Sequence, residues 1–334
     1  MSITLDERCR KLVAALELGT DNGVLSITPL TGGVSSDIAL VDLGTRKVCV
    51  KFALDQLKVV EEWHANVDRN QAEYLWLQFV SSIAPPSTPA LYGNSVELNG
   101  FAMEYVEGDG VYLWKAVLLE EQPERGEAEK VGAVLGLIHR ASDASKPLSK
   151  GFQNQKDFYD LRLEPYLVFT ATRHPQLAPK IHALVDMLNN HQLVLIHGDV
   201  SPKNIMFRQA EPIFLDAECA TIGDPSFDIS FCLNHLILKA VHIENSRNTL
   251  LISVKKFWAA YRTQITWEET AALERRVCAL LPALMLARVD GKSPVEYLDA
   301  NEQTQVRSLA ISLIEKPEEF LEDLVDRLSR NLEH

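Results

Sequence analysis

The sequence predicts an α+β fold, with a small N-terminal lobe built on an antiparallel sheet and a larger, mainly helical C-terminal lobe. The first hundred residues alternate β-branched runs with helical patterns, whereas nearly every segment after Gly108 has helical periodicity. This change of character predicts two domains, 1–105 and 106–334. With 334 residues, the chain is long enough to give each lobe a core of its own.

In the N-terminal lobe, short β-branched runs bounded by turn residues predict the strands of the sheet. Two amphipathic stretches, 5–18 and 68–81, predict helices beside it. A Gly/Ser turn at 31–36 is expected to join the first two strands. The expected strands are 26–30, 38–43, 47–52, 90–92 and 100–106.

In the C-terminal lobe, helical periodicity prevails, and segment 194–218 is the exception because it reads as strand, loop and strand. From Phe227 onward the pattern is helical, with Pro282 and Pro294 as expected interruptions. The helices expected before that point are 112–120, 127–142, 156–169 and 180–190.

The composition argues against several classes of function. A net charge of −13 disfavours binding to nucleic acid or to an anionic membrane surface. The longest apolar stretch, 278–287, is broken by Pro282 and is shorter than the roughly 20 residues that span a bilayer. The five scattered cysteines lack metal-ligand spacing, and the first ten residues carry charges that a signal peptide would not have. We therefore expect a cytoplasmic protein with reduced thiols.

Segment 194–218 carries the residues with chemical potential. It contains His197-Gly-Asp199, then Asn204 five residues later, then Asp216 at the end of a second apolar run. This order is typical of a kinase phosphoryl-transfer site, although each residue alone would fit a polar turn between buried strands. Asp199 would be the catalytic base, and His197 would brace the loop. Asn204 and Asp216 would bind Mg²⁺, which prefers hard oxygen ligands.

Glu218 has two interpretations. It follows Asp216 by two residues, so in an extended chain both side chains would lie on one face and could share a metal ion. The alternative is a salt bridge or a surface charge at a strand end. We favour the metal-site interpretation.

Residues of the N-terminal lobe fit a bound nucleotide. Lys51 ends a strand and Glu73 lies early in the next helix, an arrangement that holds the α- and β-phosphates of ATP. The Gly/Ser turn lies where a phosphate-covering loop belongs, although it lacks G-x-G-x-x-G and is also a plain hairpin turn. The expected nucleotide contacts are Gly32, Gly33, Ser35 and Ser36 in this turn, and the backbone of Glu104 and Val106 in the hinge between the lobes.

The chain after Asp216 favours a small-molecule acceptor. Asp228 follows only 12 residues later, whereas a protein kinase needs a longer activation segment ending in Ala-Pro-Glu. Asp228 is expected to cap a helix or brace the catalytic loop. On the acceptor side, Arg288 would bind the substrate or pair with Asp290. His235 is a second candidate, with a satisfied helix residue as the alternative.

These residues resemble the aminoglycoside phosphotransferase/choline kinase superfamily, through His197-Gly-Asp199, Asn204 and Asp216-x-Glu218. Within it, the chain is most similar to 5-methylthioribose kinases, but it has Val-Ser-Pro-Lys between Asp199 and Asn204 and one arginine, Arg288, where that family has two. The segments that carry the similarity are Lys51–Glu73, Met103–Lys115, Asp216–Ile229 and Ala287–Val295.

The resemblance implies a bilobal, protein-kinase-like fold with ATP and Mg²⁺ as cofactors. It implies a phosphotransferase that moves the γ-phosphoryl of MgATP to an alcohol group of a sugar or sugar-like small molecule. An amino alcohol or an aminoglycoside-type antibiotic stays open as acceptor, and so does a homodimer. A nucleotide-binding regulatory protein without catalysis is disfavoured because every site residue is present.

Overall fold

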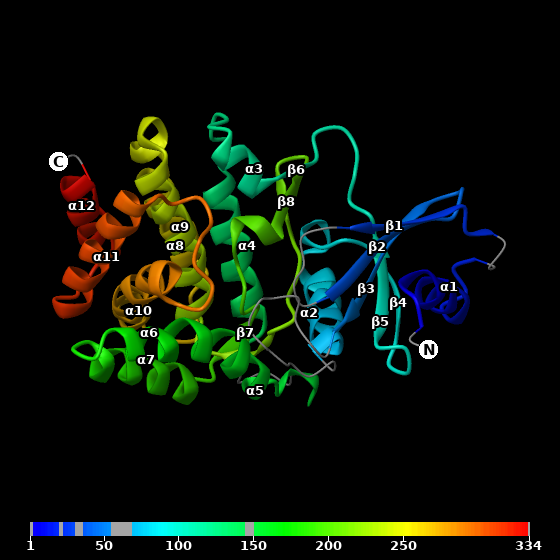
Figure 1. The fold of residues 1–334 in the computed structure, drawn as a ribbon, viewed down its shortest axis with the longest axis horizontal. Helices are drawn as coiled ribbons and strands as arrows, with labels where there is room; N and C mark the ends of the chain where they lie inside the picture. Colours follow the sequence, from blue (N-terminus) through cyan, green and yellow to red (C-terminus); the bar gives the residue numbers. More distant parts are fainter. Residues whose placement is uncertain (1–2, 20–22, 31–35, 55–68, 144–149, 333–334) are drawn as a thin grey trace.

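The structure, a computed structural model, describes residues 3–19, 23–30, 36–54, 69–143 and 150–332. Figure 1 shows a sheet with two helices on one side of the molecule and a larger assembly of helices on the other. The predicted α+β, bilobal arrangement is therefore confirmed. The chain leaves the sheet at Glu104 and enters the helical lobe.

The N-terminal sheet has five antiparallel strands in the spatial order β1 (Ser26–Leu30), β2 (Ser36–Asp42), β3 (Lys47–Ala53), β5 (Gly100–Glu104) and β4 (Leu91–Ser95). Helix α1 (Leu5–Ala15) and helix α2 (Arg69–Ile83) pack against it. All five strands lie within a few residues of the predicted positions. Because side chains alternate along a strand, Val48 and Val50 join the core with α1, while Cys49 joins the core with α2. Lys51 consequently faces the α2 side of β3.

The long helices of the C-terminal lobe are α4 (Glu127–Ala141), α7 (Ala178–Asn190), α8 (Ser226–His242), α9 (Arg247–Arg262), α10 (Thr270–Asp290), α11 (Ala300–Glu315) and α12 (Leu321–Leu332). Helix α8 lies at the centre, with every residue from Ser226 to Val241 buried against its neighbours, among them α9 and α10. Helices α4 and α9 approach closely at Gly132, where a Cβ would lie 2.3 Å from the Phe257 carbonyl oxygen.

Two small sheets interrupt the helices and position the segment that carries the chemistry. Strand β7 (Val194–Ile196) pairs with β10 (Thr221–Gly223), and β8 (Ile205–Arg208) pairs with both β6 (Tyr112–Leu113) and β9 (Glu211–Phe214). The loop between β7 and β8 is thereby held at both ends.

Three expectations for the helical lobe are corrected by the structure. Pro282 lies inside α10 without interrupting it, because the surrounding core covers this helix and offsets the cost of about 3 kcal/mol for an internal proline. Segment 156–169 is not one α-helix but α5 (Gln155–Phe158), the π-helix η4 (Tyr159–Val168), which contains Pro165, and the start of α6 (Phe169–Arg173). Segment 112–120 begins as β6 before α3 (Trp114–Leu119).

The structure bears on membrane crossing and on the state of the cysteines. Within the described ranges, no helix is long and apolar enough to cross a membrane. All five cysteines are buried, and none forms a disulfide, as predicted. Burial raises the pKa of the Cys9, Cys49 and Cys278 thiols to about 12.

Candidate active site

The loop after β7 is fixed by Asp228, which lies in the first turn of α8. Its carboxylate accepts hydrogen bonds from the backbone N–H groups of His197 (2.6 Å) and Gly198 (2.8 Å). Gly198 has a φ of +80°, and a Cβ at this position would lie 2.8 Å from that of Cys219, so only glycine fits. Of the two roles predicted for Asp228, bracing the loop is the one that the structure shows.

His197 is held by backbone groups on both sides of its ring. Nδ1 lies 3.1 Å from the Asp199 amide, which donates to it, so Nε2 carries the proton and donates to the Leu215 carbonyl, also at 3.1 Å. Burial lowers the pKa of His197, which keeps the imidazole neutral. The ring also contacts the edge of Trp76 in α2, with centroids 4.8 Å apart. His197 thus braces the loop against the N-terminal lobe.

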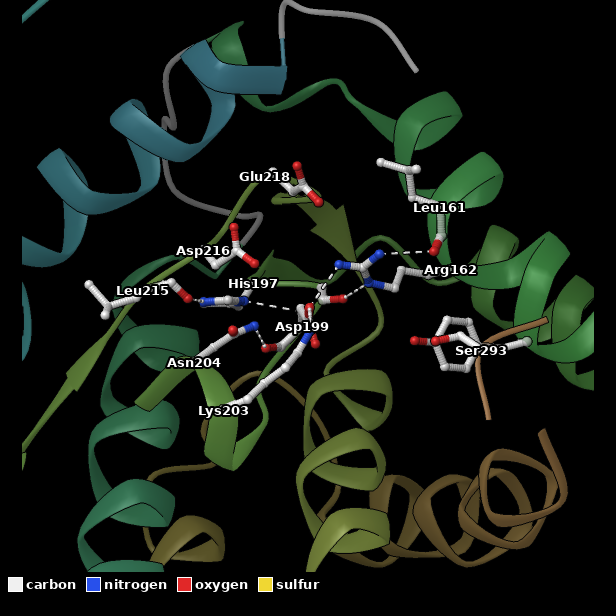
Figure 2. A network of polar contacts seen from close by, with 12 residues as sticks. Leu161, Arg162, His197, Asp199, Lys203, Asn204, Leu215, Asp216, Glu218 and Ser293 are labelled. Carbon is white, nitrogen blue, oxygen red and sulfur yellow. Dashed lines mark hydrogen bonds and ion pairs between the residues drawn. The ribbon is translucent and has the colours of Figure 1, made fainter. Parts of the chain in front are cut away.

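Asp199 is almost fully buried, and its two carboxylate oxygens differ in surroundings. Oδ2 lies 3.0 Å from Nη2 of Arg162 and 3.2 Å from Nζ of Lys203, and Figure 2 shows both side chains directed toward it. Oδ1 is buried and has no hydrogen-bond partner among the residues that the structure describes. A buried carboxylate oxygen without a partner can accept a hydrogen bond from a substrate hydroxyl, as a catalytic base must.

Lys51, Glu73 and Asp216 form a buried cluster that links the two lobes. Nζ of Lys51 lies 2.7 Å from the Glu73 carboxylate and also donates to Oδ1 of Asp216. The Asp216 amide donates to Oε1 of Glu73 at 3.2 Å. Burial alone would lower the pKa of Lys51, but the neighbouring carboxylates, Asp216 foremost, raise it above its usual value. The lysine is therefore a fixed positive charge beside the predicted metal ligand.

Asp216 has the left-handed backbone conformation, with a φ of +68°. This conformation costs a non-glycine residue about 1 kcal/mol or more and is typical of functional sites. Burial favours the neutral carboxyl, yet Lys51 and Lys203 outweigh it and hold the pKa of Asp216 below its usual value. The carboxylate is consequently ionised at neutral pH.

The predicted magnesium ligands fit the ion by their chemistry. Mg²⁺ needs only one or two protein carboxylates, because waters and nucleotide phosphates complete its shell. Asp216 supplies an ionised carboxylate, and Nδ2 of Asn204 donates to the Asp199 carbonyl at 3.1 Å, so its amide oxygen is the group for a cation. Glu218 instead forms a buried ion pair with Arg69, 3.1 Å apart. This salt bridge is the alternative left open by the sequence, and a metal role for Glu218 stays a prediction.

Only some of the other residues predicted to contact the nucleotide lie in the described part of the chain. Gly32, Gly33 and Ser35 lie outside the described residues, whereas Ser36 is buried at the start of β2. In the hinge, the Glu104 amide donates to the Ala90 carbonyl at 2.7 Å, and its side chain pairs with Arg208. An adenine contact at Glu104 would therefore use its carbonyl. The roles predicted for Glu104, Val106 and the Gly/Ser turn stay predictions.

The acceptor-side candidates, Arg288 and His235, lie in neighbouring helices, α10 and α8. Arg288 does not pair with Asp290, because the Asp290 carboxylate binds Arg307 and His174 at 2.8 Å each. Nη1 of Arg288 instead donates to the Tyr166 hydroxyl at 3.2 Å and to Ser293. His235 is buried, and its Nε2 has no partner among the described residues. Both stay predictions as acceptor-binding residues.

Sequence reasoning missed three charged residues of the site. Arg162, from the π-helix η4, donates to the Gly198 carbonyl at 2.6 Å besides its bond to Asp199. Lys203 lies within the motif segment and pairs with Asp199, and Arg69 pairs with Glu218 across 149 positions of sequence. The available signal is the position of Arg162 between Leu161 and Leu163 in a segment with helical periodicity.

The fold has two lobes, and Lys51 of a strand pairs with Glu73 of a helix opposite Asp199, Asn204 and Asp216. This arrangement defines the protein-kinase-like class of phosphotransferases. The five residues meet at the junction of the lobes, although 165 residues separate Lys51 from Asp216. The chain belongs to the phosphotransferase enzyme family (APH), whose family model matches residues 26–250.

Comparison with known proteins agrees with this assignment. A methylthioribose kinase of Bacillus cereus is 25% identical over 252 residues, which cover 66% of this chain and 63% of the relative. The chain thus matches less than two thirds of that relative's length. Among solved structures, an amicoumacin kinase in complex with AMP-PNP and Ca²⁺ has a TM-score of 0.58 and 14% identity, covering 89% of this chain and 91% of the other. An ethanolamine kinase of Plasmodium vivax has a TM-score of 0.57 and 13% identity, covering 94% and 91%. These structures share the fold.

Proposed function

We propose that this protein is a small-molecule kinase that transfers the γ-phosphoryl group of MgATP to a hydroxyl group of its acceptor. The observation that carries the proposal is the buried Oδ1 of Asp199, which has no partner in the described part of the chain. It is held beside Asn204 and opposite the cluster of Lys51, Glu73 and Asp216. Family membership and the kinases among the relatives support it.

In this mechanism Asp199 orients the acceptor hydroxyl and takes its proton as the oxygen attacks the γ-phosphorus. The new P–O bond forms while the bond from that phosphorus to the bridging oxygen of ADP breaks. Lys51 would bind the α- and β-phosphates, and Lys203 and Arg162 pair with the Asp199 carboxylate and orient it. Mg²⁺ held by Asn204 and Asp216 would neutralise charge on the phosphate oxygens.

The acceptor we propose is a sugar or sugar-like alcohol, consistent with the methylthioribose kinases among the relatives. The alternatives are an amino alcohol or an aminoglycoside, which the fold alone would also accommodate, since an ethanolamine kinase shares it. A non-catalytic nucleotide-binding role is disfavoured because Lys51 and Asp216 are brought together and both carry their charge, as phosphoryl transfer requires.

The test is the substitution Asp199→Asn, measured by ADP release over a panel of pentoses, hexoses, choline and aminoglycosides. We expect the rate with any accepted substrate to fall about 10²–10⁴-fold, because the general base is lost, with ATP affinity unchanged within a few-fold. Asp186→Asn, an exposed position on α7, is the matched control and should keep full activity. Full activity in Asp199→Asn would overturn the mechanism.

A further inference from the structure

Three helices of the C-terminal lobe contribute positively charged side chains to one region. We call this group the cationic cluster: Lys115 from α3, Lys239 from α8 and Arg288 from α10. His235 lies one turn before Lys239 on the same face of α8. All of these groups are close enough to act on one another electrostatically, since Lys115 and Arg288 each lower the pKa of both His235 and Lys239.

Lys239 is buried, and its ammonium contacts neutral groups. Its side chain is 1% exposed, and its ammonium donates to the His235 carbonyl at 3.5 Å and lies 5.1 Å from the centre of the Tyr297 ring. No carboxylate of the described residues comes within ion-pair distance of it. A buried ammonium without a paired carboxylate is costly for folding, and a bound anion would offset that cost by pairing with it.

Arg288, on the neighbouring helix α10, is likewise buried and bonded to neutral groups. It is nine-tenths buried, its Nη1 bonds to neutral groups of Tyr166 and Ser293, and its Nε has no partner among the described residues. Two further buried polar atoms of this region are also without partners in the described part of the chain, namely His235 Nε2 and the Tyr297 hydroxyl. Arg288 and Lys239 thus combine positive charge that has no carboxylate partner among the described residues with nearby unused hydrogen-bonding groups.

Tyr166 links the cluster to the catalytic loop. Its hydroxyl accepts from Arg288 at 3.2 Å, and it lies near enough to Lys203 and Arg162 to affect the pKa of both. Both of those cations bind Asp199. Its ring packs on Phe231, which in turn contacts His235 on the same face of α8. A small molecule whose hydroxyl meets Asp199 would therefore have its other end next to Arg288 and Lys239.

The charges around this position do not cancel. The carboxylate of Asp199 is matched by Arg162 and Lys203, and Glu296 is already bonded to Lys115 at 2.5 Å. Arg288, and Lys239 when it is protonated, remain as positive charges without a carboxylate partner among the described residues. A cationic amino alcohol or an aminoglycoside would be repelled here, although the whole chain carries a net charge of −13.

We propose that the acceptor is a small hydroxylated anion whose carboxylate or phosphate group is bound by Arg288 and Lys239. This inference rests on the proposed kinase function and narrows its substrate class. A carboxylate and a phosphate monoester both offer the charge and the acceptor oxygens that a guanidinium and an ammonium bind.

The proposal is tested by measuring ligand affinities calorimetrically with the protein saturated with MgAMP-PNP, an experiment that requires no turnover. Each anionic probe has an uncharged match: D-gluconate is compared with D-glucose, and D-ribose 5-phosphate with D-ribose. Choline is the cationic probe. We expect at least one anion to bind tenfold or more tightly than its uncharged match, and choline not to bind. Tighter binding of gluconate would identify a carboxylate, and tighter binding of the ribose phosphate a phosphate ester. Equal affinity for anions and their matches, or preference for choline, would overturn the proposal.

Lys239→Met and Arg288→Gln should each reduce the preference for the anion at least tenfold, whereas Lys316→Met, exposed after α11, should leave it unchanged. Lys239→Met removes a buried charge and keeps the volume, so it should fold, and a thermal melt checks this. ADP release with the same compounds separates the two hypotheses. Bound anions without any ADP release would contradict the kinase function, whereas turnover of choline or uncharged sugars alone would contradict only the anionic acceptor.

Discussion

At the scale of single residues, the chemistry of this site depends on which charges have partners. Lys51 is compensated by Glu73 and Asp216, and Asp199 by Arg162 and Lys203. Lys239 has no such partner among the described residues, and burial first, then Lys115 and Arg288, lower its pKa to about 7. One lysine therefore keeps its charge at all physiological pH values, whereas the other changes its charge near neutrality.

Lys239 should make the affinity for an anionic acceptor depend on pH. Only the protonated ammonium attracts an anion, so Kd should rise about tenfold between about pH 6 and pH 8, as the proton is lost near pH 7. Calorimetric titrations of D-gluconate, whose carboxylate stays ionised across this range, check the prediction, and the affinity of Lys239→Met should be flat. A wild-type affinity independent of pH would contradict it.

Other charged and titratable groups face Lys239 from the elements packed against it. Lys115 and Arg288 face it as cations and Glu296 as an anion, since the pKa of Glu296 is lowered despite partial burial. The lowered pKa of His235 keeps its imidazole neutral, and the raised pKa of Cys232 keeps its thiol protonated. Glu73, in the nucleotide site, also has its pKa raised to about 7 by burial, so the flat pH profile expected for Lys239→Met is the control that assigns the effect to Lys239.

At the scale of elements, close contact between helices fixes the framework behind the site. Gly132 of α4 lies against the backbone of Phe257 in α9. Replacing it with alanine should lower the free energy of unfolding by about 1–3 kcal/mol, because the clash exceeds the gain in helix propensity. Urea unfolding measures this effect. Ala133→Ser, half-buried at the next position of α4, is the control, and equal stability of the two variants would contradict the argument.

The sequence predicted elements best where pattern and local chemistry agree. Motif spacing and periodicity are local properties of a sequence. They therefore predict the strand that holds Lys51, the helix that holds Glu73 and the order of site residues from His197 to Asp216. The continuation of α10 through Pro282 is not predicted by the sequence, because burial on all sides overrides the local preference of proline. The contact of Arg162 with Asp199 spans 37 residues, and no local signal specifies it.

At the scale of the whole molecule, buried charges join the two lobes. Arg69, at the start of α2, pairs with Glu218 of the C-terminal lobe, and both side chains are buried. Sequence alone could not predict this pair, since the two residues lie 149 positions apart and Glu218 has a second interpretation as a metal ligand.

Arg69→Met should lower the free energy of unfolding by about 3–5 kcal/mol, because it leaves Glu218 buried without this partner. The double substitution Arg69→Met with Glu218→Leu should recover most of that loss, which chemical denaturation can measure. Equal instability of the single and double variants would contradict this account. The Mg²⁺ dependence of ADP release by the double variant would then show whether Glu218 also serves the metal.

The burial of all five cysteines has a practical consequence for following the lobes in solution. Buried thiols with raised pKa values react slowly with maleimide dyes, so the native chain provides a nearly silent background. Val96, beyond β4, is 71% exposed, and Ile252, in α9, is 52% exposed. Cysteines introduced at these two positions would place one fluorophore on each lobe, and energy transfer between them would report how the lobes move when nucleotide and acceptor bind.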